Sequence, residues 1–241
     1  MQVINDNGCS WINDLISRKN FQTVSSNLNC DWLIVGAGFT GLSAALTLAR
    51  AGREVAILEK NLIGEGASTR NGGITSGNIR LSKKQLISRF GPERAQTFID
   101  ESVAARADLE RFVRENKIDC DYQAVGRIVG LTGSFSSQNI ERDHNEFANR
   151  YDIEPRLISK AEMAEYTNSE KYGAGILRPD IGGIHPAKLL HEMVRLALDA
   201  GVKIFSETPV TQVSNLKTTF TLTTTKGQVT AQHLISATNA Y

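Results

Sequence analysis

The sequence has little cysteine, no surplus of charge and no long apolar run. Three cysteines among 241 residues, Cys9, Cys30 and Cys120, are too few for a disulfide framework, and none lies in a Cys-x-x-Cys motif. We therefore expect free thiols in a reducing compartment. No stretch approaches the roughly 18 apolar residues of a membrane span, and the N-terminus lacks the basic and apolar segments of a secretory signal. These absences predict a cytoplasmic protein without an integral membrane segment.

The charge balance excludes a further group of functions. Lys and Arg total 27 and Asp and Glu total 26, so the formal net charge is +1. A protein that binds nucleic acid or an anionic membrane surface needs a clear excess of positive charge, so we expect no nucleic-acid partner. The apolar fraction of 41% excludes disordered classes and allows a full core, in one large domain or two small ones.

The strongest motif is a glycine-rich turn, Gly36-x-Gly38-x-x-Gly41, between two predicted elements. Residues 31–35 predict a buried strand, and the apolar spacing after the motif predicts a helix. Residues 54–59 predict a second buried strand, so the unit is β–α–β with parallel strands. This context gives the motif its meaning as a dinucleotide-binding fingerprint.

Each residue of this fingerprint has a physical role. Gly36 allows the tight turn, Gly38 lets a pyrophosphate approach the backbone, and Gly41 permits close packing of helix on strand. The helix N-terminus offers unpaired N–H groups to the phosphates. Glu59, 18 residues after the third glycine, is placed to accept hydrogen bonds from ribose hydroxyls and disfavours NADP. The motif alone does not separate FAD from NAD.

A second segment, residues 64–73, is rich in small and polar residues. Ser68, Arg70 and Asn71 would be able to reach a pyrophosphate or the edge of a flavin ring. On composition alone an ordinary surface loop is the favoured interpretation, and a loop that lines a ligand is the alternative.

The rest of the chain alternates predicted helices and strands. The helices are predicted at 83–90, 93–116, 137–150 and 186–200, and the strands at 122–131, 173–178, 202–205, 208–213, 218–225 and 228–237. For His185 we favour a capping or packing role over contact with a substrate. For Tyr122 we favour packing in a sheet, and for Arg127 a solvated charge, over contact with a substrate. No cluster has metal-ligand spacing and no nucleophile motif occurs, so the sequence identifies no metal site and no catalytic residue.

Several collinear segments between Asp31 and Tyr241 resemble the D-amino-acid-oxidase-type FAD-dependent oxidoreductases. Within this family the sequence is most similar to the gamma-glutamylputrescine oxidase subgroup. The segments that carry the resemblance are Val35–Gly41, Ile63–Gly73, Ile118–Tyr122, Gly182–Pro186, Lys226–Ala231 and Asn239–Tyr241.

The resemblance implies an α/β fold, with a Rossmann-like FAD-binding domain of glutathione-reductase type and part of a second, antiparallel-sheet substrate domain. The implied division is an N-terminal extension at 1–29, the FAD-binding domain at 30–116 and 182–241, and the partial substrate domain at 117–181. The implied cofactor is noncovalent FAD. The residues implied to bind it are Gly36, Ala37, Gly38, Gly41, Glu59, Lys60, Ala67, Ser68, Arg70, Asn71, Gly72, Gly73, Val210, Ala237 and Thr238. Thr238-Asn239 departs modestly from the commoner Thr-Gly of the family.

The implied activity is oxidation of the C–N bond of a small amine, gamma-glutamylputrescine-like or an amino acid, by hydride transfer to flavin. The reoxidant would be O₂ or another acceptor. The family pattern continues beyond Tyr241, so an alternative is a truncated, non-catalytic FAD-binding fragment with a separate C-terminal half as its partner. A further alternative, an NAD-linked dehydrogenase, explains the first β–α–β unit but not the 67–73 loop or the strands at 202–237.

Overall fold

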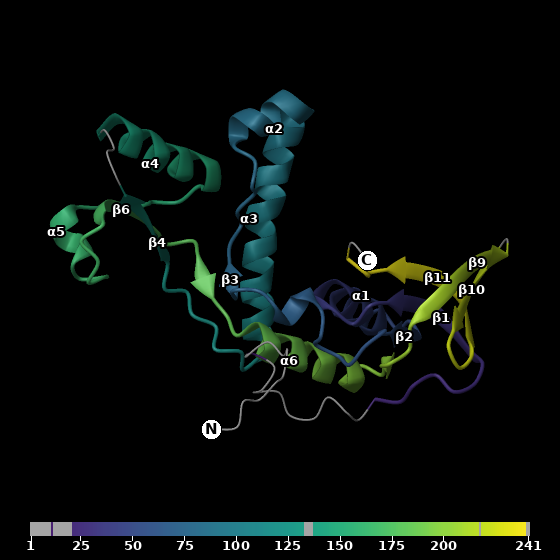
Figure 1. The fold of residues 1–241 in the computed structure, drawn as a ribbon. Helices are drawn as coiled ribbons and strands as arrows, with labels where there is room; N and C mark the ends of the chain where they lie inside the picture. The colour runs from purple at the N-terminus through teal and green to yellow at the C-terminus, as the bar shows by residue number, and fades with distance from the viewer. Residues whose placement is uncertain (1–10, 12–20, 133–136, 217, 240–241) are drawn as a thin grey trace, which may run out of the picture. The chain divides into compact units, whose positions relative to one another are not determined.

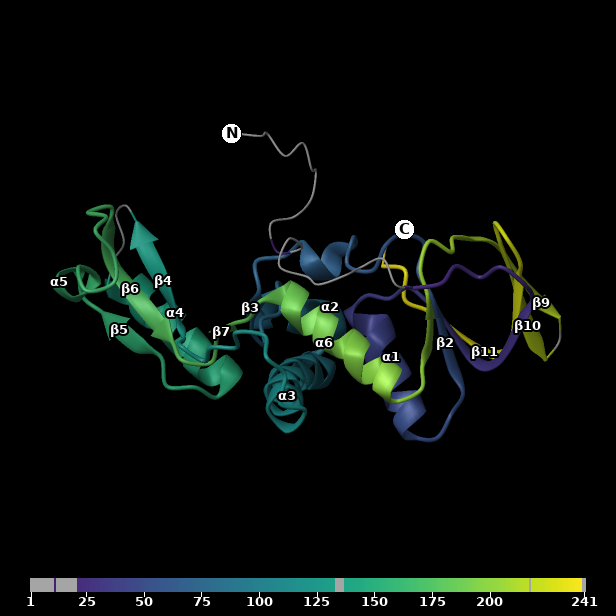
Figure 2. The same ribbon diagram turned by 90° about the horizontal axis from the view of Figure 1, so that it is seen from below.

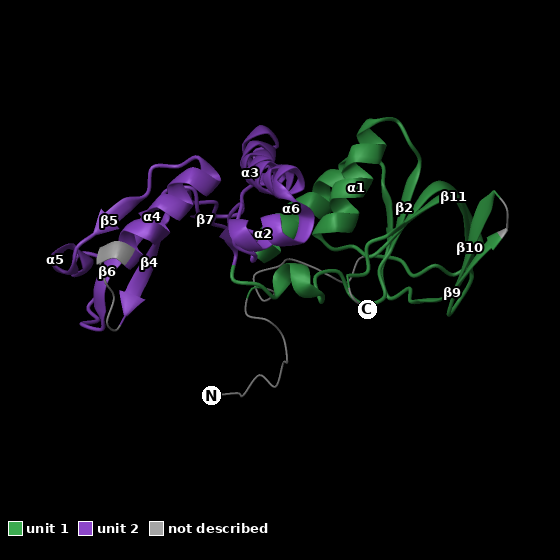
Figure 3. Ribbon diagram, turned by 90° about the horizontal axis from the view of Figure 1, so that it is seen from above, with its two compact units in different colours: residues 1–72, 185–241 green, residues 73–184 purple. Residues whose placement is uncertain are grey.

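The computed structural model describes Trp11 and residues 21–132, 137–216 and 218–239, which form two compact units (Figures 1 and 3). Unit 1 comprises residues 1–72 and 185–241, and unit 2 comprises residues 73–184. The boundaries predicted from the sequence place residues 73–116 with the cofactor domain, whereas they lie within unit 2. The assignment of a function to each unit stays a prediction.

Unit 1 contains a six-stranded sheet in the order β8-β2-β1-β11-β10-β9. Its strands are β1 (Leu28–Val35), β2 (Val55–Leu58), β8 (Lys203–Phe205), β9 (Val210–Leu216), β10 (Thr219–Thr224) and β11 (Gln228–Ser236). The first four in spatial order run parallel, and β10 and β9 follow as antiparallel neighbours. All four residues of β2 are buried, as expected for a strand inside a parallel sheet. The predicted parallel β–α–β unit is confirmed.

Two helices of unit 1 lie side by side (Figure 2), α1 (Phe39–Arg50) and α6 (Pro186–Asp199). The first buries Leu42, Ala45 and Leu46. At the start of α6, His185 Nδ1 accepts a hydrogen bond of 3.2 Å from the Lys188 N–H. The capping role predicted for His185 is therefore confirmed.

The last part of the predicted N-terminal extension is packed into unit 1. Val24 is buried within the apolar cluster around Leu33, and its N–H donates to Thr208 Oγ1 at 3.2 Å. The Gln22 carbonyl accepts from the Ser206 N–H at 3.2 Å. Residues 1–10 and 12–20 of the extension lie outside the described residues.

Unit 2 contains an antiparallel sheet in the order β4-β6-β5 and a two-stranded pair, β3 with β7. The strands are β3 (Ile74–Thr75), β4 (Arg127–Thr132), β5 (Arg156–Ile158), β6 (Tyr172–Arg178) and β7 (Gly182–Gly183). The helices are α2 (Lys83–Phe90), α3 (Pro92–Glu115), α4 (Ser137–Tyr151) and α5 (Lys160–Met163).

The strand predicted at 122–131 is wrong at its start, because β4 begins only at Arg127. Gly126 has a φ of +78°, and a Cβ built on it would lie 3.0 Å from the Arg178 carbonyl oxygen. Asp121 also has a positive φ, of 52°. Between these two left-handed positions Gln123 forms only an isolated bridge with Gly183, through two hydrogen bonds of 2.8 Å, and the chain turns before β4 begins.

A buried ion pair holds the middle of unit 2 together. The Arg178 guanidinium binds both carboxylate oxygens of Asp180, and its Nη1 donates to Asn78 Oδ1 at 2.7 Å. The rings of Phe147 and Tyr151 lie 4.7 and 4.4 Å from the guanidinium carbon. Removing either partner of the ion pair would leave an unpaired buried charge. Because Phe147 and Tyr151 belong to α4, their contacts with the Arg178 guanidinium hold this helix against the ion pair.

Among the described helices, none is long and apolar enough to cross a bilayer. Within the same residues, no group of three His, Cys, Asp or Glu side chains is placed to hold a metal ion.

Candidate functional site

The glycine turn lies where the ends of three strands of unit 1 meet. Gly36 follows β1 with a φ of +109°, and its N–H donates to the Leu58 carbonyl at the end of β2 at 2.8 Å. The Ala237 N–H, just after β11, donates to the Val35 carbonyl at 2.8 Å. The turn therefore sits at the carboxyl ends of parallel strands, the position at which open α/β sheets bind their ligands.

The glycines are required by main-chain contacts. A Cβ on Gly41 would lie 1.9 Å from the Gly36 carbonyl oxygen, and a Cβ on Gly36 would lie 2.5 Å from the Ala237 carbonyl oxygen. Both oxygens belong to the main chain, so neither can rotate away to make room for a Cβ. Helix α1 thus begins directly against the turn only because these positions lack side chains.

The N-terminus of α1 has the features of an anion site. Its N-cap, Gly38, supplies no capping side chain, and the first turn contains no acidic residue. The Phe39 N–H donates to Ser68 Oγ at 3.0 Å. Among the described residues, no acceptor is found for the N–H of Thr40 or of Gly41. These two donors, together with the helix dipole, favour a negatively charged group above the turn.

Glu59 follows β2 and faces the glycine turn. Its Oε2 accepts from the Ala37 N–H at 2.9 Å, and its Oε1 accepts from the Asn61 N–H at 3.1 Å. A carboxylate oxygen can accept two hydrogen bonds, so each oxygen retains capacity for a hydroxyl donor. The Glu59 carbonyl also accepts from the Thr208 N–H at 2.8 Å, which fixes the main chain. Lys60, the next residue, is exposed.

The loop of residues 64–72, which precedes unit 2, is held by hydrogen bonds among its own residues. A short 3₁₀ helix, η2 (Ala67–Thr69), brings Ser68 to the start of α1. Arg70 Nε donates to the Glu65 carbonyl at 3.0 Å, and Asn71 Nδ2 donates to the Ser68 carbonyl at 2.9 Å. Arg70 and Asn71 therefore stabilise the loop itself.

Sequence reasoning missed Thr69 and Trp11. Thr69 is fully buried, and its hydroxyl donates to the Gly64 carbonyl. Trp11 Nε1, in the predicted N-terminal extension, donates to the Asn71 carbonyl at 3.1 Å, a contact that the sequence did not predict. The Ser-Thr pair after Ala67 was the available signal for Thr69, since hydroxyls commonly bind nearby carbonyls in turns. No local signal connects Trp11 with Asn71, because 60 residues separate them.

The structure therefore brings some of the predicted site residues into contact with one another. The glycine turn, Glu59, Ser68 and Ala237 are joined by the contacts above, and Thr238 follows with its hydroxyl 3.4 Å from that of Ser236. Val210 opens β9 and packs against the apolar cluster around Leu33. Gly72 ends unit 1 and Gly73 begins unit 2.

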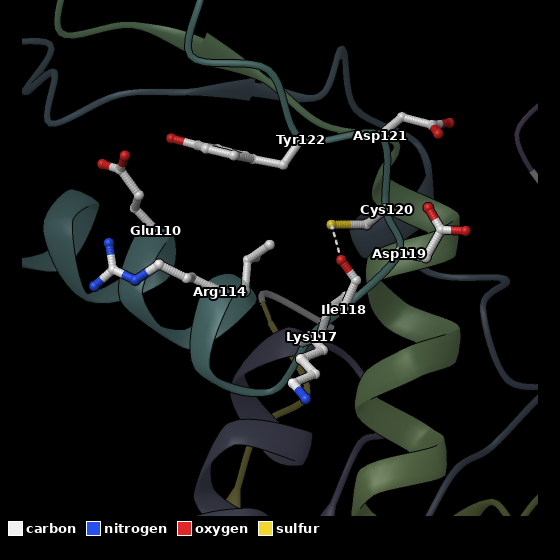
Figure 4. Close-up of a pocket in the computed structure, with 9 residues that line it drawn as sticks. Glu110, Arg114, Lys117, Ile118, Asp119, Cys120, Asp121 and Tyr122 are labelled. Carbon is white, nitrogen blue, oxygen red and sulfur yellow. Dashed lines mark hydrogen bonds between the residues drawn. The ribbon is translucent and has the colours of Figure 1, made fainter.

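A pocket lies within unit 2 (Figure 4). It has a volume of about 490 Å³ between the last turns of α3 and residues 117–122. The Tyr122 ring points toward the side of the pocket where Glu110 lies, and Cys120 Sγ lies 3.8 Å from the Ile118 carbonyl oxygen. The segment Ile118–Tyr122, on which part of the family resemblance depends, therefore lines a pocket.

The fold and the glycine turn define a dinucleotide-binding α/β protein. The family model for FAD-dependent oxidoreductases, DAO, matches residues 31–241. The chain belongs to this family.

Curated relatives support this membership, and one solved structure shares the fold. The chain is 31% identical to gamma-glutamylputrescine oxidoreductase of Escherichia coli over 92% of its own length and 51% of the relative's. It is 30% identical to the probable oxidoreductase OrdL of Rhizobium meliloti, over 97% of its length and 55% of the relative's. Glycine oxidase from Geobacillus kaustophilus superposes with a TM-score of 0.72 at 23% identity, over 87% of this chain and 55% of that one. The chain spans about half the length of the curated relatives it matches.

Replacing Gly41 with alanine tests the main-chain contact. Alanine favours a helix by about 1 kcal/mol over glycine, but the 1.9 Å approach to the Gly36 oxygen forces the backbone apart. We expect Gly41→Ala to destabilise unit 1 by about 1–3 kcal/mol. Urea unfolding followed by tryptophan fluorescence measures this, because both tryptophans, Trp11 and Trp32, belong to unit 1.

Gly66→Ala is the matched control, since a Cβ there has no atom within 4 Å. It should leave the unfolding midpoint nearly unchanged. An equal or higher stability of Gly41→Ala would contradict the contact.

Proposed function

We propose that this chain binds FAD noncovalently and takes part in oxidising the C–N bond of a small amine. The observation that carries the proposal is the joined set of glycine turn, open α1 N-terminus and Glu59. A dinucleotide fits this set, because unpaired N–H groups face a phosphate position and a carboxylate with free acceptor capacity faces a ribose position. Family membership favours FAD over NAD as that dinucleotide.

Each set of residues would contact a different part of the cofactor. The turn and α1 would bind the pyrophosphate, and Glu59 with Lys60 would lie at the adenosine ribose. The loop from Ala67 to Gly73 would line the pyrophosphate, the ribityl chain and the flavin, with Ser68 contributing from the start of α1. Val210 would lie at the adenine, and Ala237 and Thr238 would border the turn.

The described cysteines support a noncovalent cofactor. Cys30 and Cys120 are buried, and both lie outside the turn and the 67–73 loop. Burial, and after it the Glu54 carboxylate, raises the pKa of Cys30 to about 11. Its thiol is therefore neutral near pH 7 and a poor nucleophile.

Bound FAD would supply the redox chemistry, accepting a hydride from the carbon that bears the amine nitrogen before O₂ or another acceptor reoxidises it. The protein would hold the amine and exclude water. A gamma-glutamylputrescine-like amine is our specific proposal, from the name of the E. coli relative, with an amino acid as the second substrate class. We place this activity in the cytoplasm, as a step in putrescine catabolism.

The second candidate function is an FAD-binding half that is inactive alone. The half-length match to the curated relatives supports it. On this view a separate C-terminal half completes the enzyme.

Removing the charge of Glu59 tests the ribose assignment. A hydrogen bond to a charged group is worth about 1.5–3 kcal/mol, so Glu59→Gln should weaken FAD binding about 10- to 100-fold. Titration of the apoprotein with FAD, followed by flavin fluorescence, measures the change. Glu54→Gln, near the other end of β2, is the control, because Glu54 is exposed and pairs with Lys203. Equal affinities of the two variants would count against the assignment.

Anaerobic mixing with amines tests the activity. With the flavin bound, gamma-glutamylputrescine should bleach its visible absorbance faster than NADH does, since the amine is the proposed hydride donor. Bleaching by NADH and by no amine would contradict the proposed amine oxidation. Flavin binding without bleaching by any amine would support the inactive half.

A further inference from the structure

The pocket of unit 2 is formed by the way in which helix α3 ends. Lys117 lies just beyond the helix with a φ of +51°, and its N–H donates to the Arg114 carbonyl at 3.2 Å. The Ile118 N–H donates to the Val113 carbonyl at 2.9 Å. These two bonds are those of a Schellman motif, which turns the chain back over the last turn of the helix. Residues 117–122 and α3 therefore line a common pocket of about 490 Å³.

One part of the pocket is apolar and one side is aromatic. Val113 and Ile118, which belong to its lining, are both buried. The Tyr122 ring lies opposite α3 in Figure 4, and within the described part of the chain its hydroxyl has no hydrogen-bond partner. An aliphatic group that entered between this ring and the buried residues would be removed from water.

Opposite charges lie at one end of the same pocket. In Figure 4 the Glu110 carboxylate and the Arg114 guanidinium point to the end toward which the Tyr122 hydroxyl is directed. Glu110 forms a long ion pair of 3.7 Å with Arg106. The Arg114 guanidinium has no ion pair or hydrogen bond with any described residue. The other charged side chains of the lining point away from this end: Lys117, Asp119 and Asp121.

A zwitterion matches these groups. A carboxylate would bind the Arg114 guanidinium, with the Tyr122 hydroxyl as a second donor, and an ammonium group would bind the Glu110 carboxylate. A carboxylate without an ammonium group would face the charge of Glu110 unpaired. An amine without a carboxylate would likewise face the charge of Arg114.

We propose that this pocket binds a free amino acid with an aliphatic side chain. Its volume lies within the range of small-molecule sites. The inference goes beyond the proposed function, because this amino acid is additional to the amine that is oxidised. Every residue of the lining belongs to unit 2, so the site needs no flavin.

Titration of the full chain with L-leucine tests the site. In a chain with isotope-labelled isoleucine methyl groups, the nuclear magnetic resonance signal of Ile118 should shift and saturate. Isocaproate lacks the ammonium group of leucine, and isoamylamine lacks the carboxylate, so each should bind at least tenfold more weakly. A failure of FAD binding would leave this result untouched.

Two substitutions locate the charged end. Arg114→Met and Glu110→Gln each remove one charge and keep most of the side chain, so each should weaken leucine binding at least tenfold. Arg111→Met is the matched control, because Arg111 lies on the same helix, pairs with Asp108 and is not part of the lining. It should bind leucine as the unaltered chain does. Circular dichroism checks that all three variants fold.

Any of three results would overturn the proposal. The first is an Ile118 signal that leucine does not shift, or one that isocaproate or isoamylamine shifts at equally low concentration. The second is normal leucine binding by both Arg114→Met and Glu110→Gln. The third is displacement of leucine by gamma-glutamylputrescine, which would make the pocket the site of the oxidised amine.

Discussion

Unit 1 depends on the close approach of Gly41 to the Gly36 carbonyl oxygen. A Cβ there would lie 1.9 Å from that oxygen, so helix α1 can start against the end of β1 only with glycine at this position. The contact directs the N-terminus of α1 toward the ends of β1, β2 and β11. It also leaves the Ala37 N–H facing Glu59 Oε2 at 2.9 Å. One steric constraint thus places the phosphate position and the ribose position relative to each other.

The electrostatics of the site follow from this geometry. The first turn of α1 contains no acidic residue, and Ser68 rather than an N-cap side chain occupies its first donor. The positive end of the helix dipole therefore stays available to an anion. Glu59 lies at the end of the neighbouring strand, where it favours ribose hydroxyls over a 2′-phosphate. A dinucleotide needs a positive potential at its phosphates and a hydrogen-bond acceptor at its ribose, and α1 and Glu59 offer these two features. Family membership makes FAD the expected dinucleotide.

The local features of the fold could be predicted from the sequence, and the non-local ones could not. The β–α–β unit, helix 83–90 and the start of α6 at Pro186 follow from apolar spacing and capping residues close in sequence. The predicted strand at 122–131 was wrong only at its start, because the contact of Gly126 with Arg178 is distant along the chain. The pairing of Arg178 with Asn78 spans 100 residues and has no local signal. Of the candidate site, the glycines and Glu59 were identifiable by motif. The support from Trp11 depends on a contact 60 residues away along the chain, which no local pattern predicts.

The central claim is that the glycine turn and Glu59 hold FAD. The most direct measurement is the absorbance spectrum of the purified chain after reconstitution with excess FAD and removal of unbound nucleotide, followed by chromatography of whatever denaturation releases. The account predicts a flavin spectrum and release of intact FAD at about one per chain. A colourless protein that releases no flavin would contradict the account. Retention of NAD and not FAD, when the chain is incubated with both dinucleotides, would also contradict it.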